Sequence, residues 1–207
     1  MTTAELAAID GLVDALFEPG YAIVPGFLSP ETIRAMREDC LSRWQSGQFH
    51  AAGIGRAQDQ RVQTEIRSDH VLWLDESAAV PAQADYWQLM QTYQQSINRQ
   101  LYLGLQELEA HFAVYPPGSF YRKHLDRFRD EDARTVTVIV YLNDDWRAED
   151  GGYLRLYRDA AGEADFLDVA PEAGTLVTFL SDRFWHEVLP AQRERMAVTG
   201  WFRRRVA

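Results

Sequence analysis

The feature that most constrains the fold is a series of short β-rich runs that fills the chain from about residue 107 onward. Turn clusters rich in Gly, Pro, Asn and Asp separate the runs. Short strands at nearly regular spacing are typical of a closed or double-sheet architecture such as a jelly roll. The predicted strands are His111–Tyr115, Ser119–His124, Thr135–Leu142, Tyr153–Tyr157, Phe166–Val169, Thr175–Leu180, His186–Leu189 and Ala197–Phe202.

The first third of the chain has a helical pattern instead. Apolar residues recur every three to four positions over residues 6–17, over 33–44 after Ser29-Pro30, and over 86–101. The third helix is predicted to start near Pro81, and short strands are predicted at 21–24 and 71–74. We therefore predict one domain over residues 1–207, mainly β with α, in which residues 1–106 buttress a jelly-roll core formed by residues 107–207.

Composition narrows the class of protein. The chain has 31 Asp and Glu against 21 Lys and Arg, a net charge of −10, so we expect no broad basic face for nucleic acid or an anionic membrane. A single cysteine, Cys40, provides no disulfide framework and fits a reducing compartment. Residues 1–16 lack the basic region of a signal peptide, and the apolar run 136–142 is too short to cross a bilayer. We expect a cytoplasmic protein.

Two widely separated segments carry residues that can bind a metal. His124 and Asp126 are two residues apart, so on a strand both side chains point to the same face. Adding His186, which follows a buried strand and a turn, would give two histidines and one carboxylate, the facial triad of non-haem Fe(II) oxygenases. The His-x-Asp pattern alone is weak, because a structural histidine or a surface ion pair is the commoner outcome.

Arg195 strengthens the metal hypothesis. It shares one face of a predicted strand with Thr199, and a buried arginine among apolar residues would be an uncompensated charge. A ligand carboxylate could compensate it through a bidentate pair. Oxygenases with this iron site commonly use such a ligand, 2-oxoglutarate.

An ordered set of motifs runs through the same region. It consists of Tyr115-Pro116, Tyr121-Arg122-Lys123-His124-Leu125-Asp126, Arg134, Tyr141-Leu142-Asn143, Trp146, Gly151-Gly152-Tyr153-Leu154-Arg155, Ser181-Asp182-Arg183, His186-Glu187-Val188, Arg195 and Trp201. In this order the motifs resemble the 2-oxoglutarate- and Fe(II)-dependent prolyl hydroxylases, in the group that contains the animal hypoxia-inducible-factor prolyl hydroxylases and their bacterial relatives. The resemblance covers roughly residues 108–203, with a weaker match at 66–73.

The resemblance implies a double-stranded β-helix (jelly roll) and a role for each matching residue. The implied iron ligands are His124, Asp126 and His186. The implied 2-oxoglutarate contacts are Arg195 and Tyr141 at the distal carboxylate, Ile139 along the carbon chain, Leu154 and Val188 closing the pocket, and Tyr115 and Thr199 near the chelating end. The implied substrate contacts are Tyr121, Arg134 and Trp201 around the target proline, with Arg67 and Trp73 on a lid formed by about residues 51–73.

The resemblance predicts an enzyme that couples oxidative decarboxylation of 2-oxoglutarate to hydroxylation of a prolyl residue in a protein, with a translation elongation factor as an implied substrate. Its implied cofactors are Fe(II), 2-oxoglutarate and O₂, with ascorbate stimulating turnover, and we expect a monomer. Two alternatives stay open: the same chemistry on a free amino acid, small molecule or alkylated nucleic acid, and a non-catalytic jelly-roll binding module. The acidic charge disfavours nucleic acid.

Several of these residues also have a simpler interpretation. Tyr115, Tyr141 and Trp201 could be core aromatics, and Arg67 and Arg134 could be surface ion-pair partners. Other residues match no functional position. They are His50, His70 and His111, predicted to be structural or exposed, Gly151 and Gly152, predicted to form a turn, and Cys40, predicted to pack in the core.

Overall fold

The computed structural model describes residues 3–53, 63, 65–126 and 133–205. Its helices are α1 (Thr3–Phe17), α2 (Pro30–Gln45) and α3 (Ala84–Leu101). Its strands are β1 (Tyr21–Val24), β2 (His50–Ala51), β3 (His70–Leu74), β4 (Leu105–Tyr115), β5 (Tyr121–His124), β6 (Arg134–Tyr141), β7 (Leu154–Tyr157), β8 (Phe166–Val169), β9 (Leu176–Leu180), β10 (His186–Val188) and β11 (Arg195–Arg204).

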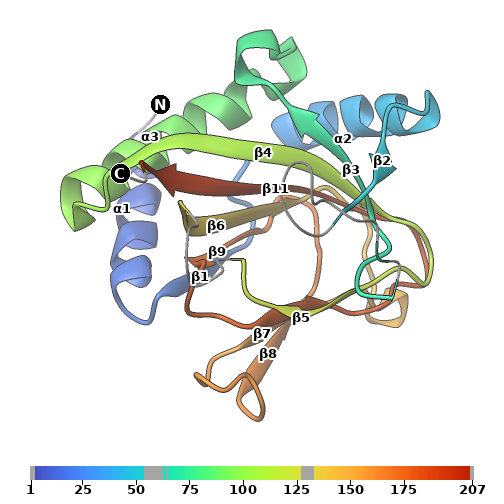
Figure 1. Cartoon of the computed structure of the whole chain (residues 1–207). Helices are drawn as coiled ribbons and strands as arrows, with labels where there is room; N and C mark the ends of the chain where they lie inside the picture. Colours follow the sequence, from blue (N-terminus) through green and yellow to red (C-terminus); the bar gives the residue numbers. More distant parts are fainter. Residues whose placement is uncertain (1–2, 54–62, 64, 127–132, 206–207) are drawn as a thin grey trace.

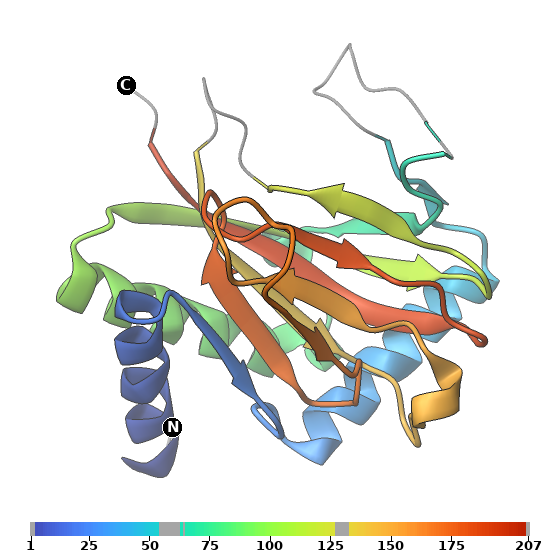
Figure 2. The same ribbon diagram turned by 90° about the horizontal axis from the view of Figure 1, so that it is seen from below.

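The strands form two antiparallel sheets. The larger sheet has seven strands in the order β1-β9-β6-β11-β4-β3-β2, and the smaller has four in the order β5-β10-β7-β8. Figure 1 shows the smaller sheet below the larger one, with α2 and α3 on the other side, and Figure 2 shows the smaller sheet from below. Two facing antiparallel sheets with crossing connections are the predicted double-stranded β-helix, so the predicted fold class is confirmed.

One face of the larger sheet packs against the helices. Even-numbered residues of its central strands, such as Phe112, Val138 and Val198, lie in one buried cluster with residues of all three helices. Because side chains alternate along a strand, all of these even-numbered residues point away from the smaller sheet. The helices present the matching apolar stripes that the sequence predicts, with Ile9 of α1 and Ile97 of α3 among the buried residues.

The other face of the larger sheet packs against the smaller sheet. Odd-numbered residues such as Ala113, Tyr141 and Ala197 share a second buried cluster with Leu156 of β7 and Val188 of β10. The register explains this, because Ala197 is directly opposite Ala113 on one side and Tyr141 on the other. The space between the sheets therefore receives the odd-numbered side chains of β4, β6 and β11.

The predicted elements differ from the observed ones mainly at their ends. β4 begins at Leu105 and not at 111, and β11 extends to Arg204, because cross-strand ion pairs support both ends where apolar alternation stops. Arg203 pairs with Glu107 (2.9 Å) and Glu109 (3.5 Å). α3 begins at Ala84, three residues after Pro81, since Pro81 starts a separate short 3₁₀ turn.

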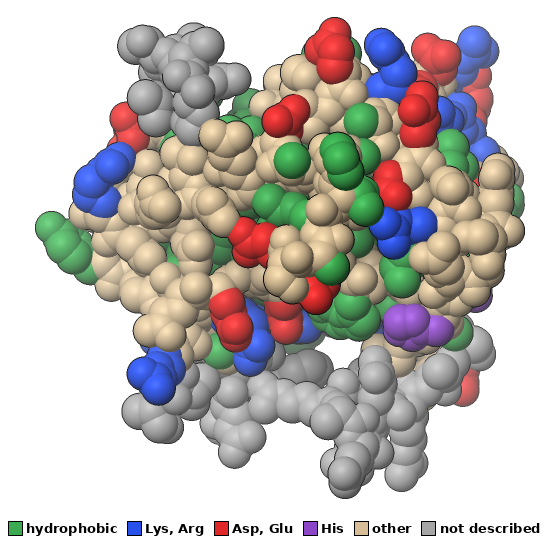
Figure 3. Space-filling view, turned by 90° about the horizontal axis from the view of Figure 1, so that it is seen from above, with side chains coloured by type: hydrophobic (Ala, Val, Ile, Leu, Met, Phe, Trp, Pro, Cys, Tyr) green, Lys and Arg blue, Asp and Glu red, His purple; other side chains and the backbone are tan. Residues whose placement is uncertain are grey.

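The outer surface carries mixed charge. Figure 3 shows acidic and basic side chains interspersed on the face seen from above. Within the described part of the chain, no helix is both long enough and apolar enough to span a bilayer.

Candidate metal centre

Three side chains that can bind a metal meet between the sheets. His124 ends β5, Asp126 follows it by two residues, and His186 begins β10. β5 and β10 are antiparallel neighbours in which His124 and His186 are directly opposite each other. One ligand atom from each of His124, Asp126 and His186 lies within 4.8 Å of the others. The register therefore brings together residues that are 60 positions apart in the sequence.

Hydrogen bonds fix which nitrogen of each histidine faces the carboxylate. His124 Nδ1 lies 2.7 Å from the Arg122 carbonyl oxygen, and His186 Nδ1 lies 3.0 Å from the Phe184 carbonyl oxygen. A neutral imidazole that donates from Nδ1 has a lone pair on Nε2. Each Nε2 lies 3.5 Å from an Asp126 oxygen, Oδ1 for His124 and Oδ2 for His186.

The electrostatics of this cluster fit a cation. Burial lowers the pKa of His186 to about 4, so its imidazole is neutral at pH 7. Burial alone would raise the pKa of the Asp126 carboxyl, but its interactions with His186 and His124 hold that pKa well below the usual range. The Nε2 lone pair of His186 and the Asp126 carboxylate thus converge beside the imidazole of His124. A divalent cation at the centre resolves this repulsion, and the N₂O donor set suits Fe(II).

Asp126 is oriented by a second layer of contacts. Thr137 Oγ1 on β6 donates a hydrogen bond of 2.8 Å to Asp126 Oδ2 and lies 2.9 Å from Ser181 Oγ. Thr137 and Ser181 are both fully buried. Such contacts restrict the direction of a metal-binding carboxylate and contribute to metal affinity.

Arg195 is a buried charge at the opposite end of the same space. Its side chain is 2% exposed, and no acidic side chain forms an ion pair with it among the described residues. Its Nε donates a 2.9 Å hydrogen bond to the Gly152 carbonyl oxygen, and its guanidinium carbon lies 5.0 Å from the ring centres of both Tyr115 and Tyr141. An unpaired buried guanidinium beside two tyrosines is suited to a carboxylate ligand.

Gly152 has to be a glycine in this arrangement. Its φ is +66°, and a Cβ there would lie 2.8 Å from Ala191 Cβ and 3.3 Å from Arg195 Cδ. The sequence predicts only a turn at Gly151 and Gly152, whereas the structure also shows that Gly152 holds Arg195 in place. Nothing in the local pattern indicates this contact.

The other predicted cosubstrate contacts lie on the facing sides of the two sheets. Tyr141 and Ile139 are successive inward residues of β6, and Thr199 is directly opposite Ile139 on β11. Leu154 and Val188 are directly opposite each other in the smaller sheet and are buried in the same cluster. The Tyr141 hydroxyl has no hydrogen-bond partner within the described residues, and burial raises the pKa of Tyr141 to about 12.

Tyr121 and Arg67 form a stack on one iron-ligand candidate. The Tyr121 ring lies 3.6 Å from the His124 ring at an interplanar angle of 17°, and the Arg67 guanidinium carbon lies 4.3 Å from the Tyr121 ring centre. Arg67 also makes two hydrogen bonds, of 2.8 and 2.6 Å, to the buried Asp69. The simpler interpretation of Arg67 as an ion-pair partner therefore holds together with its position at the site.

Arg134, Trp201 and Trp73 lie at the outer part of the same face. The Arg134 guanidinium carbon lies 3.6 Å from the Trp201 ring centre, and Arg134 Nε donates a 2.6 Å hydrogen bond to Glu109. Trp201 is buried, whereas Trp73 is 46% exposed. Of the predicted lid over residues 51–73, residues 54–62 and 64 lie outside the described part of the chain.

Sequence reasoning missed several residues around the site. They are Thr137 and Ser181 behind Asp126, Gly152 behind Arg195, Asp69 behind Arg67, and His111 beside Trp201. The predictions for the residues without a role fare better, since His50 is exposed, His70 is half-buried and Cys40 is fully buried. For Thr137 and His111 one signal was available in the sequence. Both have odd residue numbers, which places their side chains on the inward face of their strands.

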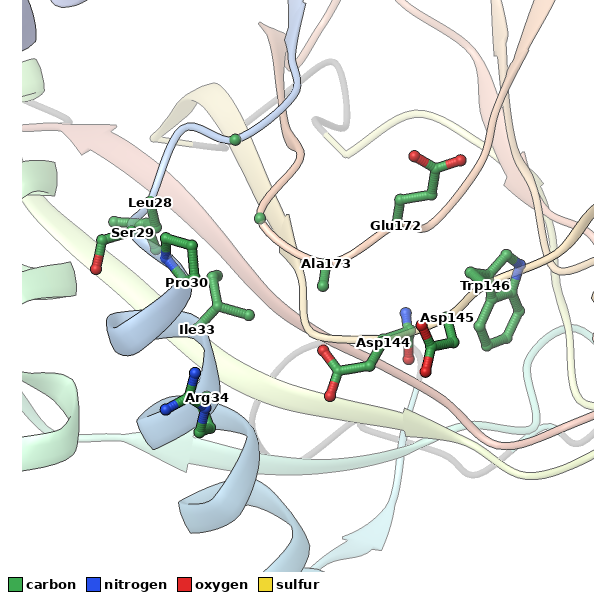
Figure 4. A pocket seen from close by; sticks show the side chains of 13 residues that line it. Leu28, Ser29, Pro30, Ile33, Arg34, Asp144, Asp145, Trp146, Glu172 and Ala173 are labelled. Carbon is green, nitrogen blue, oxygen red and sulfur yellow. The ribbon is translucent and has the colours of Figure 1, made fainter.

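A second hollow lies away from the metal-binding side chains. It is formed where the start of α2 meets the loops after β6 and before β9, with Ile33, Asp145, Trp146 and Glu172 among its lining residues (Figure 4). Asp144 at its edge pairs with Arg37 at 3.1 Å. None of the predicted site residues lines this hollow.

Comparison with known proteins agrees with the geometry. Residues 110–203 match the 2OG-Fe(II) oxygenase superfamily. A prolyl-4-hydroxylase from Pseudomonas putida superposes with a TM-score of 0.85 at 42% identity, covering 96% of this chain and 100% of that one. A prolyl hydroxylase from Trichoplax adhaerens, solved with a hypoxia-inducible factor oxygen degradation domain peptide, superposes with a TM-score of 0.85 at 27% identity, covering 98% of this chain and 94% of that one.

Curated relatives extend this likeness to animals. Human Egl nine homolog 1 is 32% identical over 94% of this chain, and the hypoxia-inducible factor prolyl hydroxylase of Caenorhabditis elegans is 31% identical over 92%. The chain spans 46% of the human protein and 27% of the worm protein. The fold and the site are those of the 2OG-Fe(II) oxygenase superfamily. The chain belongs to the branch of that superfamily that contains the prolyl hydroxylases.

Proposed function

We propose that the protein hydroxylates a prolyl residue of another protein and couples this reaction to oxidative decarboxylation of 2-oxoglutarate. The observation that carries the proposal is the convergence of His124, Asp126 and His186 beside the buried Arg195, which has no ion-pair partner among the described residues. The relatives named as prolyl hydroxylases support the choice of substrate residue. A binding module would have no need to keep four such costly side chains together.

The proposed roles follow the positions of the side chains. His124, Asp126 and His186 hold Fe(II), which with 2-oxoglutarate and O₂ supplies the oxidising chemistry. Arg195 binds the distal carboxylate of 2-oxoglutarate, and the unpartnered Tyr141 hydroxyl donates a hydrogen bond beside it. Ile139, Leu154 and Val188 enclose its carbon chain and exclude water, and Tyr115 and Thr199 lie toward the chelating end.

The protein itself contributes orientation. Thr137 orients the Asp126 carboxylate, and the Phe184 and Arg122 carbonyls lie at hydrogen-bond distance from the two Nδ1 atoms, so that each Nε2 is turned toward Asp126. Gly152 holds Arg195 through its carbonyl, so that the carboxylate-binding guanidinium points into the space between the sheets. Contacts of this kind fix the directions of the metal-binding and carboxylate-binding side chains, which is the preorganisation that a metal-dependent oxidation requires.

The substrate side of the site supports a protein partner. Tyr121, Arg134 and Trp201 are proposed to surround the target proline, while Arg67 and Trp73 belong to the lid of residues 51–73. The Trichoplax relative was solved with a peptide of a protein substrate domain. A translation elongation factor is the first candidate substrate to test. We also propose that residues 1–207 form one domain, in which residues 1–106 support a core formed by residues 107–207. This domain acts as a cytoplasmic monomer with no nucleic-acid or membrane partner. Ascorbate is proposed to stimulate its turnover.

The test uses wild-type protein and Asp126→Ala side by side. Each is incubated with Fe(II), 2-oxoglutarate, ascorbate and either a bacterial cell lysate or purified elongation factor, and mass spectrometry locates prolines that gain one oxygen atom. We expect such a proline with the wild type and none with Asp126→Ala. Oxygen incorporation confined to free amino acids or small molecules would favour the alternative oxygenase. No visible charge-transfer band on anaerobic addition of Fe(II) and 2-oxoglutarate would contradict both oxygenase functions.

A further inference from the structure

His111 lies in the middle of an aromatic platform at the site. It is on β4, directly opposite Trp73 of β3 and Thr199 of β11. Its ring stacks on Trp201 with a centroid distance of 5.4 Å and an interplanar angle of 27°, and it lies 4.9 Å from the Trp73 ring. We call these three rings, Trp73, His111 and Trp201, the platform. Residues directly opposite each other in an antiparallel sheet share a face, so the platform faces the same space as the metal-binding side chains.

The imidazole of His111 is buried without a complete set of hydrogen bonds. Its side chain is 3% exposed, and its Nδ1 has no hydrogen-bond partner in the described part of the chain. A buried polar atom left unpaired costs about 1–3 kcal/mol, and such atoms are rare enough to need an explanation. Neither of the flanking indoles hydrogen-bonds to this nitrogen, and Trp201 Nε1 is likewise without a partner among the described residues. A ligand that hydrogen-bonds to this nitrogen would remove the cost.

The surroundings of His111 indicate the chemistry of that ligand. Burial, with Arg67 and Arg134 nearby, holds the pKa of His111 well below its usual value, so the imidazole is neutral and offers an N–H donor. The same two arginines disfavour a cationic ligand. The platform runs from the exposed Trp73 to the buried Trp201, which suits a chain segment that enters from solvent.

Position along the strands separates His111 from the Arg195 end of the cosubstrate pocket, whereas Thr199 directly opposite His111 is a predicted contact at the chelating end. His111 and Thr199 are four residues from Tyr115 and Arg195 on the same two strands, a distance of about 13 Å along the sheet. A small dicarboxylate whose distal carboxylate is bound by Arg195 therefore cannot also place that carboxylate at His111. A segment that carries proline offers carbonyl acceptors and lacks the proline N–H, so a donor is the group that recognises it best.

We propose that His111 is a substrate-binding residue: its Nδ1–H donates a hydrogen bond to a backbone carbonyl beside the target proline, while Trp73 and Trp201 pack against the same segment. This inference rests on the proposed function and adds to it a residue that determines substrate affinity. It assigns a role to a histidine that the sequence predicts to be structural.

The test compares His111→Phe with His111→Asn. Phenylalanine keeps the ring but loses both nitrogens, whereas the asparagine amide nitrogen can take the place of Nδ1. The probe is a synthetic peptide centred on the proline that gains oxygen in the lysate experiment. For His111→Phe we expect KM for the peptide to rise about tenfold, the effect of losing one buried hydrogen bond, with kcat within about twofold. His111→Asn should recover most of the loss.

Two controls make the result decisive. The visible band formed with Fe(II) and 2-oxoglutarate shows whether each variant is folded and binds both, and the KM for 2-oxoglutarate is measured beside the KM for the peptide in each variant. If His111→Phe loses the band because it does not fold, His111→Met replaces it as the variant without a donor. An unchanged peptide KM, an equal rise in both variants, or a rise in KM for 2-oxoglutarate instead would each overturn the inference. A wild type that decarboxylates 2-oxoglutarate but oxidises no prolyl peptide would overturn the proposed function, and the inference with it.

Discussion

The two faces of the seven-stranded sheet are built from alternate residues of the same strands, yet they differ in kind. The face toward the helices carries Phe112, Val138 and Val198, all buried in one apolar cluster. The face toward the smaller sheet carries Arg195 and His111, which are also buried; among the described residues Arg195 has no ion-pair partner and His111 Nδ1 has no hydrogen-bond partner. Neighbours in the sequence, such as His111 and Phe112, thus belong to opposite environments.

This difference separates stability from binding. Apolar burial on the helix side contributes to the free energy of folding, while unpaired polar groups on the site side reduce it. The sheet can hold such groups because its other face is packed against three helices. Substitutions at two adjacent residues of one strand should therefore differ in effect: one on the helix side should change the free energy of unfolding, and one on the site side should change ligand binding.

The largest effect on stability is expected for Phe112→Ala. Removing a fully buried ring from the helix-side cluster should lower the free energy of unfolding by about 3–5 kcal/mol, measured by urea denaturation. The KM for 2-oxoglutarate should stay within about twofold of wild type at a temperature where the variant is folded. Thr199→Ala, on the site side of the neighbouring strand, is the matched control and should show the reverse pattern. A large rise in KM for Phe112→Ala would break the division between the faces.

Arg195→Met should have the next largest effect, and on binding instead of stability. Losing a buried partner for the 2-oxoglutarate carboxylate should cost about 2–3 kcal/mol, which is about a 10²-fold rise in KM. Its effect on the Fe(II) requirement should be much smaller. The free energy of unfolding without ligand should be unchanged or higher, because an unpaired buried charge is removed. Arg203→Met is the control, since that arginine pairs with Glu107 and Glu109.

A clear drop in the stability of ligand-free Arg195→Met would contradict this view. It would mean that the hydrogen bond from Arg195 to the Gly152 carbonyl holds the fold together. In that case Arg195 would be a structural residue, and it would no longer be evidence that the site-side face serves binding instead of stability.

The same division explains what the sequence could predict. Alternation within one strand is local, so the strand positions, the shared face of His124 and Asp126, and the shared face of Arg195 and Thr199 were all accessible. The resemblance supplied the distant member, His186, which no local pattern connects with β5. The start of β4 and the end of β11 were not predicted because apolar residues no longer alternate there. Ion pairs between Arg203 and the glutamates Glu107 and Glu109 connect the two strands instead.

Contacts that depend on strand order could not be predicted from these patterns. Thr137 reaches Asp126 because β6 passes behind the metal-binding side chains, and Gly152 reaches Arg195 from a loop 43 residues earlier. His111 looked like an unassigned histidine because its neighbours Trp73 and Trp201 come from two other strands. In each case the partner lies on a different element, and only the register of the sheets identifies it.

The smallest predicted effect is the pH dependence of stability, and it also distinguishes the two faces. Burial lowers the pKa of His186 to about 4 and that of His111 well below its usual value, so both stay neutral in the folded, metal-free protein. The unfolded chain binds a proton at each histidine near pH 6.5. Their contribution to stability is therefore complete above about pH 6.5 and is lost as the pH falls toward 4.

Urea denaturation between pH 7.5 and 6.0 should show a loss of up to about 1 kcal/mol for each of these histidines. His111→Phe should remove its share of the slope, while Phe112→Ala should lower stability equally at every pH in this range. On the helix side, burial raises the pKa of Cys40 to about 12, so its thiol stays neutral throughout this pH range. A stability that does not change over this range would mean that the site-side histidines are charged in the folded protein. The Nε2 atoms facing Asp126 would then carry protons, and the cluster would be an ion pair instead of a set of metal ligands.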